Sequence, residues 1–173
     1  MKKRLIGLGL FTLTIFGLFL TVQPLLAQGD LIGNPAKPFT ITSLDGKTIS
    51  LDSFKGKVII LNFWNTECSP CRAEIPEFIQ FYRDFEKKGV VIIGLSIHDR
   101  NDALREFSKT NRINYPIVND SENRVARLYG GIRSIPTTFV DRKGIIRDMR
   151  VGGIDKQELL KMVEPYLLEV IKE

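Results

Sequence analysis

The stretch Phe63–Arg72, FWNTECSPCR, holds both cysteines of the chain, Cys68 and Cys71, and its only tryptophan, Trp64. It continues a nearly unbroken apolar and β-branched run, VIILNFW (Val58–Trp64), which is typical of a strand buried on both faces. After the cysteines, apolar residues recur at helical spacing until a glycine ends the pattern. The sequence therefore predicts that the cysteine pair lies between a buried strand and the first turn of a helix.

The segments on either side of this unit predict an α/β domain. A second apolar run, VVIIGLSI (90–97), makes a strand–helix–strand unit, so the two strands should be parallel. Upstream, FTITSLDGKTISL (39–51) alternates on both sides of Asp45-Gly46, which indicates a β-hairpin. Downstream, the expected elements are a helix at 102–110, a short strand at 115–118, an antiparallel pair at 137–140 and 145–151, and an amphipathic helix at 155–172.

The first 27 residues read as an export segment. MKKR is a basic start, and residues 5–27 carry no charge. The apolar run is long for a cleaved signal and suits one membrane span of roughly 20 residues. Both a cleaved signal peptide and a signal anchor formed by residues 5–26 therefore stay open, and either would place the domain outside the cytoplasm. We expect 28–37 to be a linker and 38–173 to form the domain.

The charge of the chain argues against nucleic-acid binding. Its formal net charge is +5, but residues 1–27 contain three basic residues and no acidic one, so the remainder carries only +2. No basic run with interleaved aromatic residues occurs elsewhere. The exported part has the size of one domain, which we expect to be a monomer.

The cysteine pair is a poor fit to a zinc, haem or purely structural role. Structural zinc takes four ligands, and the chain offers two cysteines and one histidine, His98. Covalent haem attachment needs a histidine directly after the second cysteine, where this chain has Arg72. A Cys68–Cys71 bridge closes a very short loop, so its entropic contribution should fall below the ~3 kcal/mol of a loop of about 15 residues. A structural bridge is therefore the weaker alternative.

The predicted position of the pair favours a reactive dithiol. At a helix start, unpaired N–H groups and the helix dipole favour thiolate over thiol, which should activate Cys68. Cys71, three residues later, lies on the same helical face. One thiolate can then attack a partner's disulfide while the second resolves the mixed disulfide.

Two motifs resemble the exported thioredoxin-like oxidoreductases of the ResA/TlpA type: LNFWNTECSPCRAEIPEF (61–78) and GIRSIPTTFVDRKG (131–144). The resemblance implies a thioredoxin fold, with a central mixed β-sheet flanked by helices, an added N-terminal β-hairpin and an inserted helix–strand segment. It implies an exported thiol–disulfide oxidoreductase that reduces protein disulfides without a cofactor. The family includes the periplasmic thiol reductants of cytochrome c maturation, so the resemblance suggests apocytochrome c as a substrate and a membrane thiol transporter as the electron donor.

The resemblance also implies roles for individual residues. Cys68 and Cys71 would form the redox-active disulfide, and Glu74 would manage protons for the thiols. The bond before Pro136 would be cis and face the cysteines, which would leave the backbone of Ile135 free to pair with an extended substrate peptide. The plain alternative for Glu74 is a solvated helix glutamate.

Three residues near the pair are less tightly assigned. Trp64 is expected beside the dithiol, both in the core and in substrate recognition. Glu67 departs from the family, where an aromatic residue usually precedes the first cysteine, and we expect it on the rim that meets the substrate. Its carboxylate disfavours a nearby thiolate, while the helix end favours one, so the net effect stays open. Asn62 stands where thioredoxin has a buried acid, which leaves Glu74 the better candidate for proton transfer.

Two other functions fit the sequence less well. A thiol peroxidase of the related peroxiredoxin type has threonine three residues before its reactive cysteine, whereas Thr66 here is two before Cys68. A copper-binding chaperone of related fold could use both thiols and His98, but its cysteines are usually spaced one residue wider. The plain interpretation of His98 is a polar loop residue.

Overall fold

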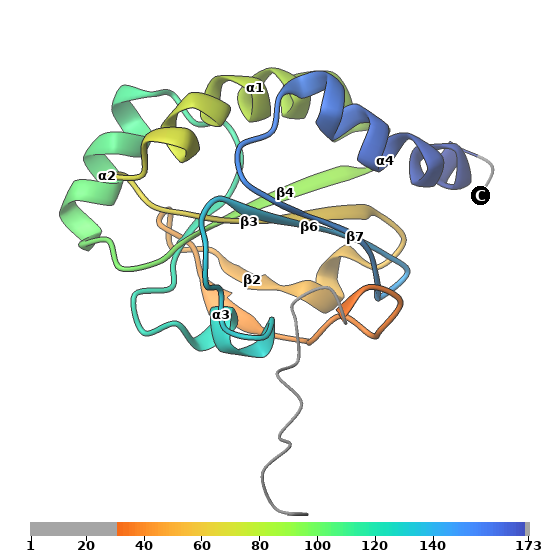
Figure 1. Cartoon of the computed structure of the whole chain (residues 1–173), viewed down its shortest axis with the longest axis horizontal. Helices are drawn as coiled ribbons and strands as arrows, with labels where there is room; N and C mark the ends of the chain where they lie inside the picture. Colours follow the sequence, from red (N-terminus) through yellow and green to blue (C-terminus); the bar gives the residue numbers. More distant parts are fainter. Residues whose placement is uncertain (1–30, 172–173) are drawn as a thin grey trace, which may run out of the picture.

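The core of the molecule is a five-stranded mixed sheet in the order β5-β4-β3-β6-β7 (Figure 1). The computed structural model describes residues 31–171, so the predicted export segment lies outside it. The sheet strands are β3 (Val58–Trp64), β4 (Val90–Ser96), β5 (Ile117–Asn119), β6 (Thr137–Arg142) and β7 (Ile145–Val151). A separate hairpin pairs β1 (Thr40–Thr42) with β2 (Thr48–Ser50). The helices are α1 (Ser69–Phe85), α2 (Asn101–Thr110), α3 (Arg124–Leu128) and α4 (Lys156–Ile171), with short 3-10 turns at Leu51–Phe54 and Glu86–Lys88.

Alternation along β3 divides the core into two layers. Successive side chains of a strand point to opposite faces. The first set packs against α1, α2 and α4, and consists of Val58, Ile60 and Trp64. The second set packs against the hairpin and α3, and consists of Ile59, Leu61 and Phe63. In Figure 1, α1 and α4 lie above the sheet and β2 and α3 lie below it, so β3 is covered on both faces and is apolar at nearly every position.

The predicted elements are largely confirmed. β3 and β4 are parallel, β6 and β7 are antiparallel, and the hairpin forms around Asp45-Gly46. α2 and β5 form the inserted helix–strand segment. β5 begins at Ile117 rather than at Tyr115, and the ring of Tyr115 packs in the core against Phe78 and Tyr82. The short helix α3 was not predicted.

The described part of the predicted linker, 31–37, is held against the end of the sheet. The backbone N–H of Gly33 donates to the carbonyl of Ile146 at 2.8 Å, and that of Ala36 donates to Gly144 at 2.9 Å. Of the helices within 31–171, none combines the length and apolar character needed to cross a membrane.

Three chain segments meet at one edge of the sheet. The carboxyl ends of the parallel strands β3 and β4 lie together, with Trp64 opposite Ser96. The start of β6 lies at the same edge because β6 is antiparallel to β3, with Thr137 opposite Phe63. The turns that follow β3 and β4 and the loop that precedes β6 are therefore neighbours, and the cysteine pair lies among them.

Candidate active site

The cysteine pair occupies the start of α1, as the sequence predicted. Cys68 is the N-cap residue of the helix, and Pro70 lies in its first turn, where a missing N–H costs no helical hydrogen bond. The two cysteines are joined as a disulfide, and the N–H of Cys71 donates to the sulfur of Cys68 at 3.3 Å. Cys71 is completely buried, whereas Cys68 is half-buried. Only the first sulfur is therefore accessible to a partner.

A cis-proline loop faces this sulfur. The Ile135–Pro136 bond is cis, and the carbonyl oxygen of Ile135 lies 3.7 Å from Sγ of Cys68. The hydroxyl of Thr137 donates to the carbonyl of Ser134 at 2.6 Å, and the N–H of Gly152 donates to the carbonyl of Pro136 at 2.8 Å. These bonds hold the loop from both sides. Pro136 itself is buried and Ile135 half-buried, so the loop offers mainly backbone next to the disulfide.

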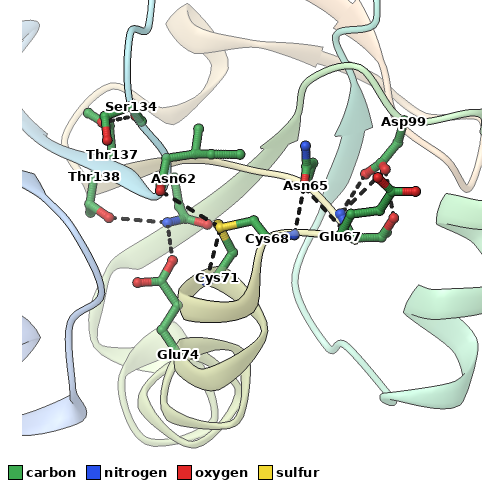
Figure 2. Close-up of a disulfide and its surroundings, with 12 residues drawn as sticks. Asn62, Asn65, Glu67, Cys68, Cys71, Glu74, Asp99, Ser134, Thr137 and Thr138 are labelled. Atoms are coloured by element: carbon green, nitrogen blue, oxygen red, sulfur yellow. Dashed lines mark hydrogen bonds between the residues drawn. A yellow bond between two sulfur atoms is a disulfide. The ribbon is translucent and has the colours of Figure 1, made fainter.

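Glu74 lies buried beneath the disulfide, one helical turn after Cys71. Its side chain is 3% exposed, so it is not the solvated surface glutamate of the plain alternative. Asn62 donates from Nδ2 to one carboxylate oxygen at 2.9 Å, and the backbone N–H of Ile154 donates to the other at 3.2 Å. The same Asn62 nitrogen donates to Oγ1 of Thr138 at 3.1 Å. The amide thus joins β3, which carries it, to α1 through Glu74 and to β6 through Thr138 (Figure 2).

The environment of Glu74 brings the pKa of its carboxyl close to neutral pH. Burial disfavours the charged form and raises the pKa of the carboxyl to about 7, while the hydrogen bonds from Asn62 and Ile154 act in the opposite direction. A group with a pKa near the working pH can both accept and release a proton. Asn62 thus acts on the carboxylate of Glu74 as a hydrogen-bond donor.

Trp64 belongs to the core, and the structure gives no support to its expected contact with substrate. Its side chain is 1% exposed and packs on the ring of Phe107 from α2, with ring centroids 5.6 Å apart. The guanidinium carbon of Arg72 lies 5.8 Å from the centre of the same Phe107 ring. The inserted helix therefore covers the indole, which explains why an aromatic side chain beside the dithiol does not reach the surface.

A hydrogen-bonded loop that the sequence did not reveal leads into Cys68. Oδ1 of Asn65 accepts the N–H groups of Glu67 at 3.1 Å and of Cys68 at 2.8 Å. Asp99 accepts both the N–H of Thr66, at 3.0 Å, and its hydroxyl, at 2.6 Å. Asn65 could have been suspected, because asparagine often forms such turns after a strand. No local signal points to Asp99, which meets Thr66 only through the pairing of β3 with β4.

The remaining predicted residues lie at the surface. Glu67 is exposed on the turn directly before Cys68, as expected for a rim residue. His98 is exposed in a loop and has a left-handed backbone, with φ of 66°. Within residues 31–171, no group of three or more histidine, cysteine, aspartate or glutamate side chains is arranged to hold a metal ion.

Comparisons with known proteins agree with this geometry. The AhpC/TSA family model matches residues 32–149. The thiol-disulfide oxidoreductase ResA of Bacillus thuringiensis subsp. konkukian is 36% identical over 140 residues, which cover 80% of this chain and 78% of that protein. ResA of Geobacillus thermodenitrificans is 30% identical over 152 residues, or 87% of this chain and 84% of that one.

Solved structures with the same fold carry related names. A thiol:disulfide interchange protein of the thioredoxin family from Chlorobium tepidum superposes with a TM-score of 0.72 at 33% identity, covering 77% of this chain and 95% of that one. StoA from Bacillus subtilis gives a TM-score of 0.66 at 29% identity, covering 76% and 98%. The accessible sulfur, the buried partner cysteine and these relatives lead to one conclusion. The chain belongs to the AhpC/TSA family and is a thioredoxin-fold thiol–disulfide oxidoreductase.

Proposed function

We propose that this oxidoreductase reduces disulfide bonds of proteins outside the cytoplasm, with Cys68 as the attacking sulfur and Cys71 as the resolving one. The observation that carries the proposal is the unequal exposure of the pair: Cys71 is 0% exposed, while Cys68 is half-buried at the start of α1. A protein substrate can reach only the sulfur of Cys68. The N–H of Cys71 also points at that sulfur, so it would stabilise a negative charge there.

The reaction begins from the reduced enzyme. The Cys68 thiolate attacks one sulfur of the substrate disulfide, the substrate S–S bond breaks, and a mixed disulfide forms while the second substrate sulfur leaves and takes up a proton. The Cys71 thiol then loses its proton and attacks Sγ of Cys68, which releases the first substrate sulfur as a thiol. The substrate gains two electrons and two protons in total, and the enzyme is left with the Cys68–Cys71 disulfide.

Glu74 would take the proton from Cys71 in the resolving step. Both residues are buried on the same face of α1, where bulk water is a poor acceptor. A carboxyl with a pKa of about 7 is ionised in enough molecules at neutral pH to accept this proton, and it releases the proton again readily. The transfer can run directly or through one water molecule.

Substrate docking would use the backbone of the cis-proline loop. An extended peptide can pair with the Ile135 backbone beside Pro136, which places a substrate sulfur next to Cys68. Glu67, exposed on the turn directly before Cys68, would form part of the docking rim. We do not include Trp64 in this surface because it is buried.

The resemblance to ResA/TlpA proteins extends the proposal to substrate, donor and location. We propose oxidised apocytochrome c, whose haem site contains a CxxCH motif, as a substrate. A membrane thiol transporter would return the enzyme to its reduced state. Residues 1–27 would export the domain, either as a cleaved signal or as an anchor in the membrane.

Trapping of mixed disulfides tests this proposal. Cys71→Ser, incubated with an oxidised CxxCH peptide, should accumulate a mixed disulfide on non-reducing gels, because the resolving thiol is gone. Cys68→Ser is the matched control and should trap little peptide. Equal trapping by the two variants would contradict the assigned roles. A reduced parent enzyme that leaves the peptide disulfide intact would contradict the reductase function.

A further inference from the structure

A buried carboxylate outside the dithiol and its acid holds the turn before Cys68. Asp99 follows β4, is 9% exposed, and its carboxylate accepts hydrogen bonds from three donor groups of two other residues. Two come from Thr66, through the backbone N–H at 3.0 Å and the hydroxyl at 2.6 Å. The third donor is the hydroxyl of Ser96, at the end of β4, at 2.5 Å. A charge buried to this extent is retained only with such partners.

The attachment to Thr66 has two points, which fixes an orientation as well as a position. A single hydrogen bond leaves the chain free to rotate about it. Two hydrogen bonds, from the backbone and the side chain of one residue, fix the orientation of that residue relative to the carboxylate. Thr66 lies between Asn65, whose side chain accepts the N–H groups of Glu67 and Cys68, and the N-cap residue Cys68. The turn is therefore tied at one end to Asp99 and at the other to the helix start (Figure 2).

The backbone N–H groups around Cys68 go to different acceptors. The N–H groups of Thr66 and Cys68 are directed to Asp99 and Asn65 and away from the sulfur. The N–H of Cys71, by contrast, points at the sulfur at 3.3 Å. The sulfur thus depends on the helix start for stabilisation of its charge, and that stabilisation depends on how Cys68 is oriented at the N-cap.

We propose that Asp99 is a positioning residue for Cys68, which acts through Thr66 to hold the sulfur in line with the helix N-terminus and opposite the cis-proline loop. This inference rests on the proposed role of Cys68 as the attacking sulfur. Asp99 does not touch the reacting atoms in this role. It sets the reactivity of the thiolate by fixing the turn that carries it.

Position and charge act in opposite directions, so the two must be tested separately. Loss of the tie should loosen the N-cap and make the Cys68 thiolate less stable. Loss of the negative charge of Asp99 should make the thiolate more stable. Thr66→Val weakens the tie without changing the charge, because it removes the hydroxyl donor, leaves the backbone N–H donor, and keeps both the shape of the side chain and the charge of Asp99. Asp99→Asn removes the charge together with part of the tie.

The test measures iodoacetamide alkylation of Cys68 across pH in a Cys71→Ser background. Thr66→Val should move the profile to higher pH and slow alkylation at pH 7 by about three- to tenfold, since the rate follows the thiolate fraction. Thr66→Ser keeps the hydroxyl and should restore the parent profile. Ser96→Ala is the matched control, because it removes a hydrogen bond to the same carboxylate that does not reach the turn.

The outcomes separate the explanations. If the Thr66→Val profile superimposes on the parent's while its unfolding temperature falls, Asp99 is only a structural tie and the inference is overturned. An equal shift in Ser96→Ala would also overturn it, because the route through Thr66 would not be specific. Asp99→Asn should lie between the parent and Thr66→Val, and faster alkylation than the parent would show that charge, and not position, is what Asp99 contributes. Failure of the trapping experiment would remove the role of Cys68 in protein reduction but leave these thiol profiles interpretable.

Discussion

Replacement of Glu74 by glutamine should make the stability of the oxidised protein less dependent on pH. The pKa of Glu74 rises on folding from 4.5 to about 7, so the folded chain binds more protons than the unfolded chain between these values. The free energy of unfolding of the parent must therefore fall as the pH rises through that range. Ionisation of the buried carboxyl costs the folded state about 3 kcal/mol by this shift. Glutamine resembles the protonated acid and carries no such cost.

Urea denaturation of the oxidised parent and Glu74→Gln at pH 4 to 8 measures this effect. At low pH we expect the two free energies of unfolding to agree within about 1 kcal/mol, because protonated Glu74 and glutamine each offer one acceptor oxygen to Asn62 and Ile154. By pH 8 the variant should be more stable by about 3 kcal/mol. Glu106→Gln, on the exposed side of α2, is the control for a change of charge in water. A constant difference between parent and Glu74→Gln across pH would refute the argument from burial.

Three further predictions concern the rim, the core and the direction of electron flow. Glu67→Trp should lower the pKa of the Cys68 thiol slightly and make the disulfide modestly more oxidising, because a nearby carboxylate disfavours thiolate; unchanged alkylation and glutathione equilibria would contradict this. Gly94→Ala should destabilise the fold by about 1–3 kcal/mol in urea, because a Cβ there would lie 2.6 Å from Cδ1 of Ile117, and a parent-like midpoint would show that the core can adjust. Titration against glutathione, followed by Trp64 fluorescence, should place the dithiol on the reducing side of that couple, and an equilibrium in favour of the dithiol would oppose a reductase role.

The elements that sequence predicted well are those with a strong local pattern. β3 and β4 are continuous apolar runs, and a helix between them forces a parallel pair, so the site could be placed at their carboxyl ends. The cysteines lie at a helix start because a strand ends and a proline follows within the same few residues. By contrast α3, with only five residues, is too short to show a helical period.

The parts that sequence could not predict depend on distant pairs. The surface alternative for Glu74 stayed open because its burial requires Asn62 from β3 and the loop before α4. The position of Trp64 in the core was predictable, but its coverage by Phe107 of α2 was not. Asp99 lies 33 residues from Thr66 in sequence and becomes its partner only when β3 and β4 pair.

The bond from the N–H of Ile154 to Glu74 spans 80 residues and uses only the main chain of the later segment. Every amino acid except proline supplies that donor, so the segment before α4 can drift in sequence without losing its hold on the acid. A comparison of relatives by residue identity would then overlook this partner. Chimeras that exchange the C-terminal helix between homologues should keep this hydrogen bond if the loop reaches the same place, while a chain cut ahead of residue 154 would lose it with every cysteine intact.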